Sequence, residues 1–139
     1  MLIHGKCHCG NIRFTLAWAS DPTAIPARAC DCSFCTKHGA AWTSDPDARL
    51  QVVVDDAAAV SHYAFGTGSS DFHVCMRCGV VPLVTCRVDG VLYAVVNVRA
   101  FDDVDPALLQ HVSASFSNEG LEARLARRKS RWIGDVTFA

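Results

Sequence analysis

The stretch DFHVCMRCG, residues 71–79, leads from extended chain directly into two cysteines and a glycine. Two thiolates separated by one or two residues can bind one ion, because a tight turn points both sulfurs inward. Gly79 allows the left-handed backbone that such a turn requires. The stretch therefore predicts a metal-binding turn at the end of a strand.

The same pattern occurs twice more along the chain. Seven of the eight cysteines fall into three groups. These are Cys7-x-Cys9-Gly10, Cys30-x-Cys32-x-x-Cys35 and Cys75-x-x-Cys78-Gly79. Zinc suits soft sulfur ligands and a tetrahedral arrangement, so we expect zinc as the cofactor. The eighth cysteine, Cys86, has apolar neighbours in an expected strand and is interpreted as a small core residue.

Sulfur counting divides these groups into two kinds of site. If the first and third groups pool their ligands, Cys7, Cys9, Cys75 and Cys78 form a closed structural site. The middle group then keeps three sulfurs, which leaves one coordination position for water or substrate. Three thiolates donate strongly and blunt the acidity of the metal. Thiol or aldehyde chemistry is therefore favoured over hydrolysis.

Two alternatives for the middle group stay open at this point. A histidine could fill its fourth position, and His8, His38 and His73 are near enough in sequence to compete. Thiolates also hold iron–sulfur clusters, although the spacings match neither ferredoxin pattern.

Length and composition narrow the class of protein. The chain has 139 residues, 50% of them hydrophobic, and a formal net charge of −1. We expect one globular domain over residues 1–139, without the global positive field that draws proteins to nucleic acid or anionic membranes. The sequence shows neither a long apolar span nor a signal peptide, so we expect a cytoplasmic protein. A reducing compartment favours metal ligation over disulfides.

Periodicity predicts a mainly β fold. The expected strands cover residues 11–18, 40–44, 49–54, 62–65, 71–74, 80–88 and 91–98. Asp89-Gly90 is a strong hairpin signal between the last two. Prolines predict a surface loop over 20–26, leading into the cysteine-rich stretch 29–35.

The C-terminal part of the chain has a different character. Pro106 predicts a helical start over 105–110, and residues 118–131 predict a short helix with a basic end. We interpret the basic run 124–131 as a solvated helix face. Trp18, Trp42 and Trp132 are interpreted as core residues.

Four stretches together resemble a known family. They are GKCHCGNIRF (5–14), CDCSFCTKHGAA (30–41), FHVCMRCG (72–79) and YAVVNVRAFDDVD (93–105). They are similar to the glutathione-dependent formaldehyde-activating enzymes and their relatives, which include centromere protein V. The resemblance covers about residues 5–115 and leaves 116–139 as a variable extension.

The resemblance implies a fold, two metal sites and an activity. The fold would be a β-tent of small twisted antiparallel sheets pinned by zinc, here with a short C-terminal helix. Cys7, Cys9, Cys75 and Cys78 would hold a structural zinc, and Cys30, Cys32 and Cys35 a second zinc that takes part in catalysis. The family's named activity joins formaldehyde and glutathione into S-hydroxymethylglutathione, a carbon–sulfur lyase reaction in the condensing direction.

The sequence departs from the family pattern beside the middle group. The family has His after the first cysteine and Arg after the third, where this chain has Asp31 and Thr36. The lost Arg removes a bidentate partner for a glutathione carboxylate, and Asp31 adds negative charge near the metal. Ser33 and Lys37 match the pattern and are candidates for orienting a ligand.

These observations predict a zinc-dependent carbon–sulfur lyase-like enzyme, with two zinc ions per chain and a small thiol or aldehyde substrate, glutathione among the candidates. One alternative is a non-catalytic zinc-stapled binding module for protein or nucleic acid. Another is a thiol redox or metal-buffering protein that uses the middle cysteines themselves. No membrane partner is expected, nucleic acid is not the favoured partner, and the oligomeric state is left open.

Overall fold

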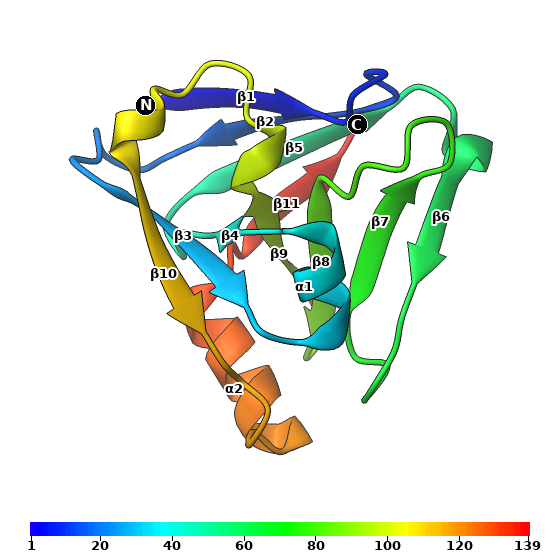
Figure 1. Cartoon of the computed structure of the whole chain (residues 1–139), viewed down its shortest axis with the longest axis vertical. Coiled ribbons are helices and arrows are strands. Elements are labelled where there is room, and N and C mark those ends of the chain that lie inside the picture. The colour runs from blue at the N-terminus through cyan, green and yellow to red at the C-terminus, as the bar shows by residue number, and fades with distance from the viewer.

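The computed structural model describes residues 1–139 and contains two β-sheets (Figure 1). The smaller sheet has the order β1 (Leu2–Lys6), β2 (Ile12–Ala17), β5 (Arg49–Val54), β11 (Asp135–Phe138). The larger sheet has the order β10 (Leu109–Ala114), β3 (Ile25–Cys30), β4 (Trp42–Thr43), β9 (Val91–Asn97), β8 (Leu83–Val88), β7 (Asp71–Cys75), β6 (Val60–Tyr63). The expected mainly β fold is confirmed.

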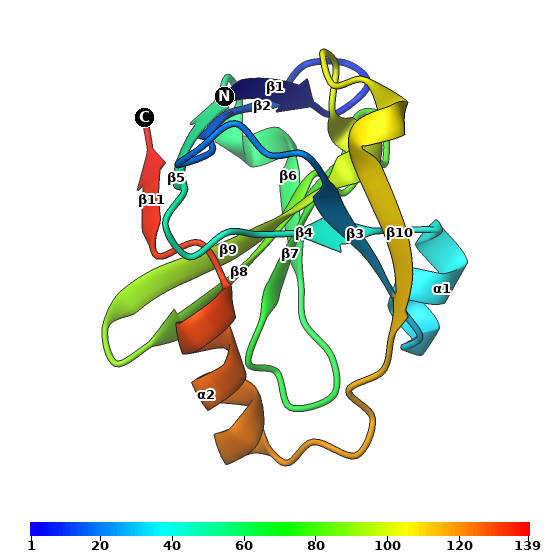
Figure 2. The ribbon, with the colours of Figure 1, turned by 90° about the vertical axis from the view of Figure 1, so that its left-hand side faces the viewer.

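Two α-helices accompany the sheets, α1 (Ser33–His38) and α2 (Leu121–Arg131). Single 3₁₀ turns lie at Ala57–Ala59, Val98–Ala100 and Pro106–Leu108. Figure 2 shows β10 running beside β3, with α2 near the β8–β9 end of the larger sheet. Neither helix combines the length and the apolar character that a membrane crossing requires.

The main core lies between the two sheets. Ile12, Phe14 and Leu16 alternate along β2 and are almost fully buried, as their period of two predicts. They belong to one apolar cluster with Leu50 of β5 and Leu83 of β8. The alternation in the sequence therefore specifies which face of the smaller sheet turns inward.

The hairpin between β8 and β9 follows the prediction closely. All six residues of β8 pair with β9 in antiparallel register. Asp89 and Gly90 have φ angles of 50° and 80°, the left-handed pair that a two-residue hairpin turn needs. The predicted strands over 49–54 and 71–74 are also found, as β5 and β7. The strand predicted over 62–65 lies at Val60–Tyr63 instead.

Two local predictions are wrong. The loop expected over 20–26 ends early, because β3 already begins at Ile25 and pairs in parallel with β10. Pro26 is tolerated because this half of β3 pairs with β10 alone. The pairing of β3 with β4 is limited to Arg28 and Trp42. The helical start expected over 105–110 is one 3₁₀ turn, since Leu109 already enters β10. Long-range pairing overrides local propensity in both cases.

The C-terminal helix is confirmed but shorter than the predicted 118–131. It begins at Leu121, because Gly120 adopts extended backbone as the N-cap. It ends at Arg131, after which Trp132 turns the chain toward β11.

Gly5 of β1 has no room for a side chain. A Cβ atom there would lie 2.3 Å from Phe14 Cζ and 2.8 Å from the Ala100 carbonyl oxygen. We expect Gly5→Ala to lower the free energy of unfolding by about 3 kcal/mol, because the backbone oxygen cannot move away easily. Urea unfolding of the zinc-loaded protein measures this. Gly120→Ala is the control, since nothing lies within 4 Å of its Cβ position; equal losses would contradict the prediction.

Candidate metal centre and its cavity

Four cysteines from two distant hairpins meet in what we call the four-sulfur cluster. Its members are Cys7, Cys9, Cys75 and Cys78, whose Sγ atoms all lie within 4.8 Å of one another. The separations are 3.8 Å for Cys7–Cys9 and 3.5 Å for Cys9–Cys75. Zinc bonded tetrahedrally to sulfur at about 2.3 Å requires sulfur–sulfur distances of about 3.8 Å. The donor set therefore fits a zinc ion that ties the β1–β2 loop to the end of β7.

The turns of this cluster have the predicted backbone. Gly10 and Gly79 have φ angles of 86° and 80°. Their N–H groups donate to the carbonyls of Cys7 and Cys75 at 3.1 and 2.7 Å, which closes each turn. Only glycine enters this region without strain, so the glycine after each cysteine pair is required by the geometry.

Two thiols of the four-sulfur cluster have pKa values shifted in opposite directions. Burial raises the pKa of Cys7 to about 11. Burial also acts to raise the pKa of Cys78, but backbone and side-chain hydrogen bonds to its sulfur together outweigh burial and lower the pKa to about 6. The thiolate of Cys78 thus lies beside the protonated thiol of Cys7 at neutral pH. A divalent cation can replace that proton, as expected of a metal site.

The remaining group forms what we call the three-sulfur cluster, at the junction of β3 and α1. Cys30 is the last residue of β3, Cys32 is the N-cap of α1, and Cys35 lies in its first turn. Their three Sγ atoms lie within 4.8 Å of one another. Cys32 Sγ accepts the Cys35 N–H at 3.3 Å, and Trp42 Nε1 donates to Cys35 Sγ at 3.3 Å. The sulfurs are therefore held by the helix terminus and by an indole.

This cluster also contains a thiolate beside a thiol. A hydrogen bond from Cys35 is the main cause that lowers the pKa of Cys30 to about 6. The same hydrogen bond and burial raise the pKa of Cys35. Three soft donors with one already ionised are compatible with zinc.

None of the histidines considered from the sequence joins the three-sulfur cluster. The ring of His38 lies 4.5 Å from that of Phe34. His73 lies on β7, where it forms a separate group with His62 and Asp71. His8 is exposed in the β1–β2 loop. No histidine or carboxylate lies within 4.8 Å of all three sulfurs.

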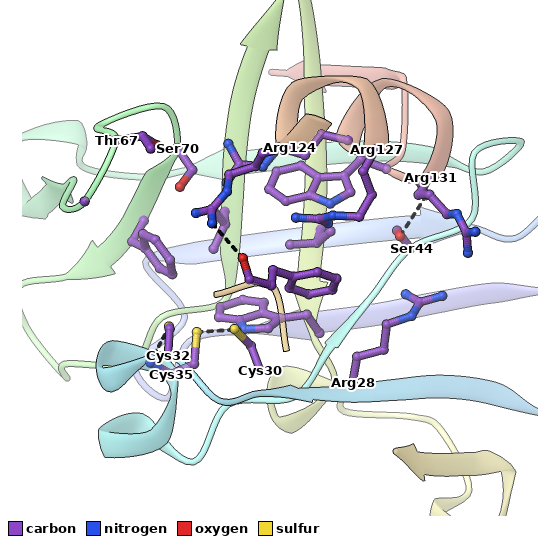
Figure 3. Close-up of a pocket in the computed structure, with 18 of the residues that line it drawn as sticks. Arg28, Cys30, Cys32, Cys35, Ser44, Thr67, Ser70, Arg124, Arg127 and Arg131 are labelled. Atoms are coloured by element: carbon purple, nitrogen blue, oxygen red, sulfur yellow. Dashed lines mark hydrogen bonds between the residues drawn. The ribbon is translucent and has the colours of Figure 1, made fainter. Parts of the chain in front are cut away.

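The three-sulfur cluster lines a cavity of about 520 Å³ (Figure 3). Apolar walls come from aromatic side chains of two strands, two loops and the residue after α2, including Trp42, Phe72 and Trp132. Trp42 and Trp132 are 8% exposed, so both are core residues as predicted, and both also border the cavity. Trp18 is half-buried against the main core.

The basic run on α2 does not form the predicted solvated face. Arg124, Arg127, Arg128 and Arg131 all line the cavity, and Arg128 is only 6% exposed. Their spacing of i, i+3, i+4 and i+7 places them on one side of the helix. That side turns inward because Arg128 contacts Ser69, Cys86 and the Trp132 ring. Lys129 points elsewhere and pairs with Asp89.

Arg28 of β3 is a cavity residue that the sequence analysis missed. Burial first, and then the positive charges of Arg131 and Arg127, lower its pKa. The guanidinium of Arg28 therefore lies close to those of Arg127 and Arg131, although these residues are far apart in the sequence. The helical spacing could have indicated the α2 face, whereas an isolated arginine in a strand carries no signal.

The other predicted ligand contacts lie outside the cavity. Ser33 and Lys37 are exposed on α1, and neither lines the cavity. Asp31 does line it, beside the cysteines.

The fold and the two cysteine clusters define a mainly β protein equipped to hold metal ions. The family model described as glutathione-dependent formaldehyde-activating enzyme matches residues 2–118. The chain belongs to this family. It is also similar to a Rhodobacter sphaeroides protein of known crystal structure, with 30% identity over 74% of this chain and 91% of that chain and a TM-score of 0.53. Helix α2 lies beyond the matched residues.

Proposed function

We propose that the protein is a zinc-dependent carbon–sulfur lyase-like enzyme that acts on the adduct of a small thiol and an aldehyde. Family membership supports a formaldehyde-activating role in general. The observation that carries the specific proposal is the three-sulfur cluster, which has no histidine, carboxylate or further cysteine within 4.8 Å of all three sulfurs and borders a cavity. An outside molecule has room to approach the sulfurs there.

The two clusters have different roles in this proposal. The four-sulfur cluster holds a structural zinc and staples the two sheets. Cys30, Cys32 and Cys35 hold the second zinc, which when bound would stabilise a substrate thiolate or polarise an aldehyde oxygen. The indole N–H of Trp42 fixes the sulfur of Cys35 in place. The aromatic walls limit water around the reacting groups and strengthen electrostatic interactions there.

The reaction in the condensing direction needs no oxidant or reductant. The thiolate sulfur attacks the aldehyde carbon, a carbon–sulfur bond forms, and the carbonyl electron pair moves to oxygen. That oxygen then takes up a proton, which balances the proton lost by the thiol. The role of the chain is to bring both reactants together in one orientation.

Two further parts of the proposal concern the cellular location of the protein and the kind of partner that it binds. None of the eight cysteines forms a disulfide, which is consistent with a reducing, cytoplasmic location. The inward turn of the α2 arginines favours a small ligand over nucleic acid, so the binding-module alternative is not adopted.

Exchange spectroscopy by NMR tests the activity. In a mixture of formaldehyde and glutathione, the protein is expected to speed interconversion of free and adduct formaldehyde, with metal analysis giving close to two zinc ions per chain. Adding a chelator that strips the accessible zinc should return the rate to the uncatalysed value. An unchanged exchange rate with the fully loaded protein would refute the activity on glutathione, and one zinc ion per chain would refute the second site.

A further inference from the structure

Five guanidiniums line the cavity, a large positive charge for one small space. They belong to Arg28, Arg124, Arg127, Arg128 and Arg131. Two of the five have an acidic partner. Arg127 makes a bidentate pair with Glu119 at 2.8 and 3.1 Å, and Arg124 Nε lies 3.6 Å from the same carboxylate. The positive charge of the other three has no such compensation.

Arg128 is the most buried of the three. Its Nη1 donates to Ser69 Oγ at 2.8 Å and to Cys86 Sγ at 3.4 Å, and its Nε has no hydrogen-bond partner. No carboxylate lies within ion-pair distance of it. A buried cation without an anion is costly, so an anion entering the cavity would be bound favourably.

Arg28 and Arg131 stand opposite each other across one side of the cavity. Figure 3 shows Arg28 rising from β3 and Arg131 descending from the end of α2, with Ser44 between them. Neither guanidinium forms an ion pair with an acidic side chain. Guanidinium groups bind carboxylates and phosphates through paired N–H donors, and two of them can share a doubly charged group.

We propose that Arg28, Arg128 and Arg131 form a subsite for a doubly anionic substrate, either a dicarboxylate or a phosphate monoester. The subsite and the three-sulfur cluster line the same cavity, so one small molecule can place its anionic end at the arginines and its thiol or aldehyde end at the sulfurs. This substrate class rests on the proposed function, whereas the anion subsite itself does not. Arg128 and Arg131 lie on α2, beyond the family-matched residues 2–118, whereas Arg28 lies on β3 within them.

Calorimetric titration of the zinc-loaded protein with unreactive probes tests the subsite. The probes are succinate, inorganic phosphate and the neutral succinamide, in a low-salt buffer without competing anions. We expect succinate or phosphate to bind and succinamide not to bind. The preferred anion identifies the dicarboxylate or the phosphate class.

Matched variants on the same helix localise the binding. Arg131→Gln is expected to weaken anion binding by about tenfold, because it removes one guanidinium from the subsite. Lys129→Gln removes the same charge from an exposed residue of α2 that does not line the cavity, and should change binding less than twofold. Arg28→Gln should behave as Arg131→Gln does, although it lies on a different element.

The outcomes separate the subsite from the proposed function. Absence of anion binding, binding of succinamide as tight as that of succinate, or equal weakening by Lys129→Gln and Arg131→Gln would each overturn the subsite. A protein that binds the anions but does not accelerate thiol–aldehyde exchange would retain the subsite and lose the proposed function. A protein that accelerates thiol–aldehyde exchange but does not bind the anions would retain the proposed function and lose the subsite.

Discussion

Cys75→Ser is expected to leave the protein unfolded under conditions where the wild type is folded. Cys75 is completely buried and belongs to the four-sulfur cluster, which joins the β1–β2 loop to the end of β7. Structural zinc contributes apparent free energies of about 10–16 kcal/mol in zinc-finger peptides, whereas whole domains are stable by only about 5–15 kcal/mol. Loss of one of four ligands should therefore remove most of the stability. Far-UV circular dichroism and amide NMR dispersion measure it.

Cys86→Ser provides the matched control for that experiment. It makes the same chemical change at a residue that is only 3% exposed and belongs to neither cluster. We expect it to lower the free energy of unfolding by about 1 kcal/mol, since a small buried group becomes more polar. If Cys75→Ser stays folded and melts at the same temperature as Cys86→Ser, the four-sulfur cluster does not staple the fold.

Cys32→Ser is expected to abolish thiol–aldehyde exchange while preserving the fold. Serine is a good N-cap, so the side chain can still accept the hydrogen bond that Cys35 N–H now gives to the Cys32 sulfur. The thiolate ligand is nevertheless lost. The expected result is a rate at least about a thousandfold lower, equivalent to about 4 kcal/mol in the barrier, with zinc content falling from two ions to one.

The exposed residue Thr36, on the same helix, supplies the control for the exchange measurement. Thr36→Ala should retain nearly all the activity, because this side chain is exposed and does not line the cavity. Two results would count against the proposal. If Cys32→Ser unfolds as Cys75→Ser is expected to, the three-sulfur cluster is structural, and if it keeps full activity, the cluster is not the reaction site.

The cysteine clusters could be predicted from the sequence because their geometry is local. A tight turn brings Cys75 and Cys78 together whatever the rest of the chain does, and Gly79 is needed to form that turn. The alternation along β2 and the Asp89-Gly90 turn are local signals of the same kind. Local sequence is therefore enough to predict these features.

The elements that were missed depend on partners far away in the sequence. β3 and β10 pair in parallel across about 80 residues, and β11 pairs in parallel with β5. Pro26 weakens the strand signal of β3 when that segment is considered alone. The β11 strand is only four residues long. Such pairings are set by the whole fold and leave little trace in local periodicity.

The cavity was the least predictable feature of the site. The helical spacing from Arg124 to Arg131 shows that the arginines share a face, but a basic face normally turns to water. Its inward orientation depends on contacts with Ser69 and Cys86, which no local pattern reveals. That Ser33 and Lys37 orient a ligand stays a prediction, and their exposure on α1 gives it no geometric support.

A crystal structure of the zinc-loaded protein, soaked with a small thiol, tests the central claim most directly. The account predicts an ion bonded to the sulfurs of Cys30, Cys32 and Cys35, with the thiol sulfur or a water molecule as its fourth ligand. A fourth ligand supplied by a protein side chain, or a metal-free three-sulfur cluster in reduced protein whose four-sulfur cluster is filled, would contradict it.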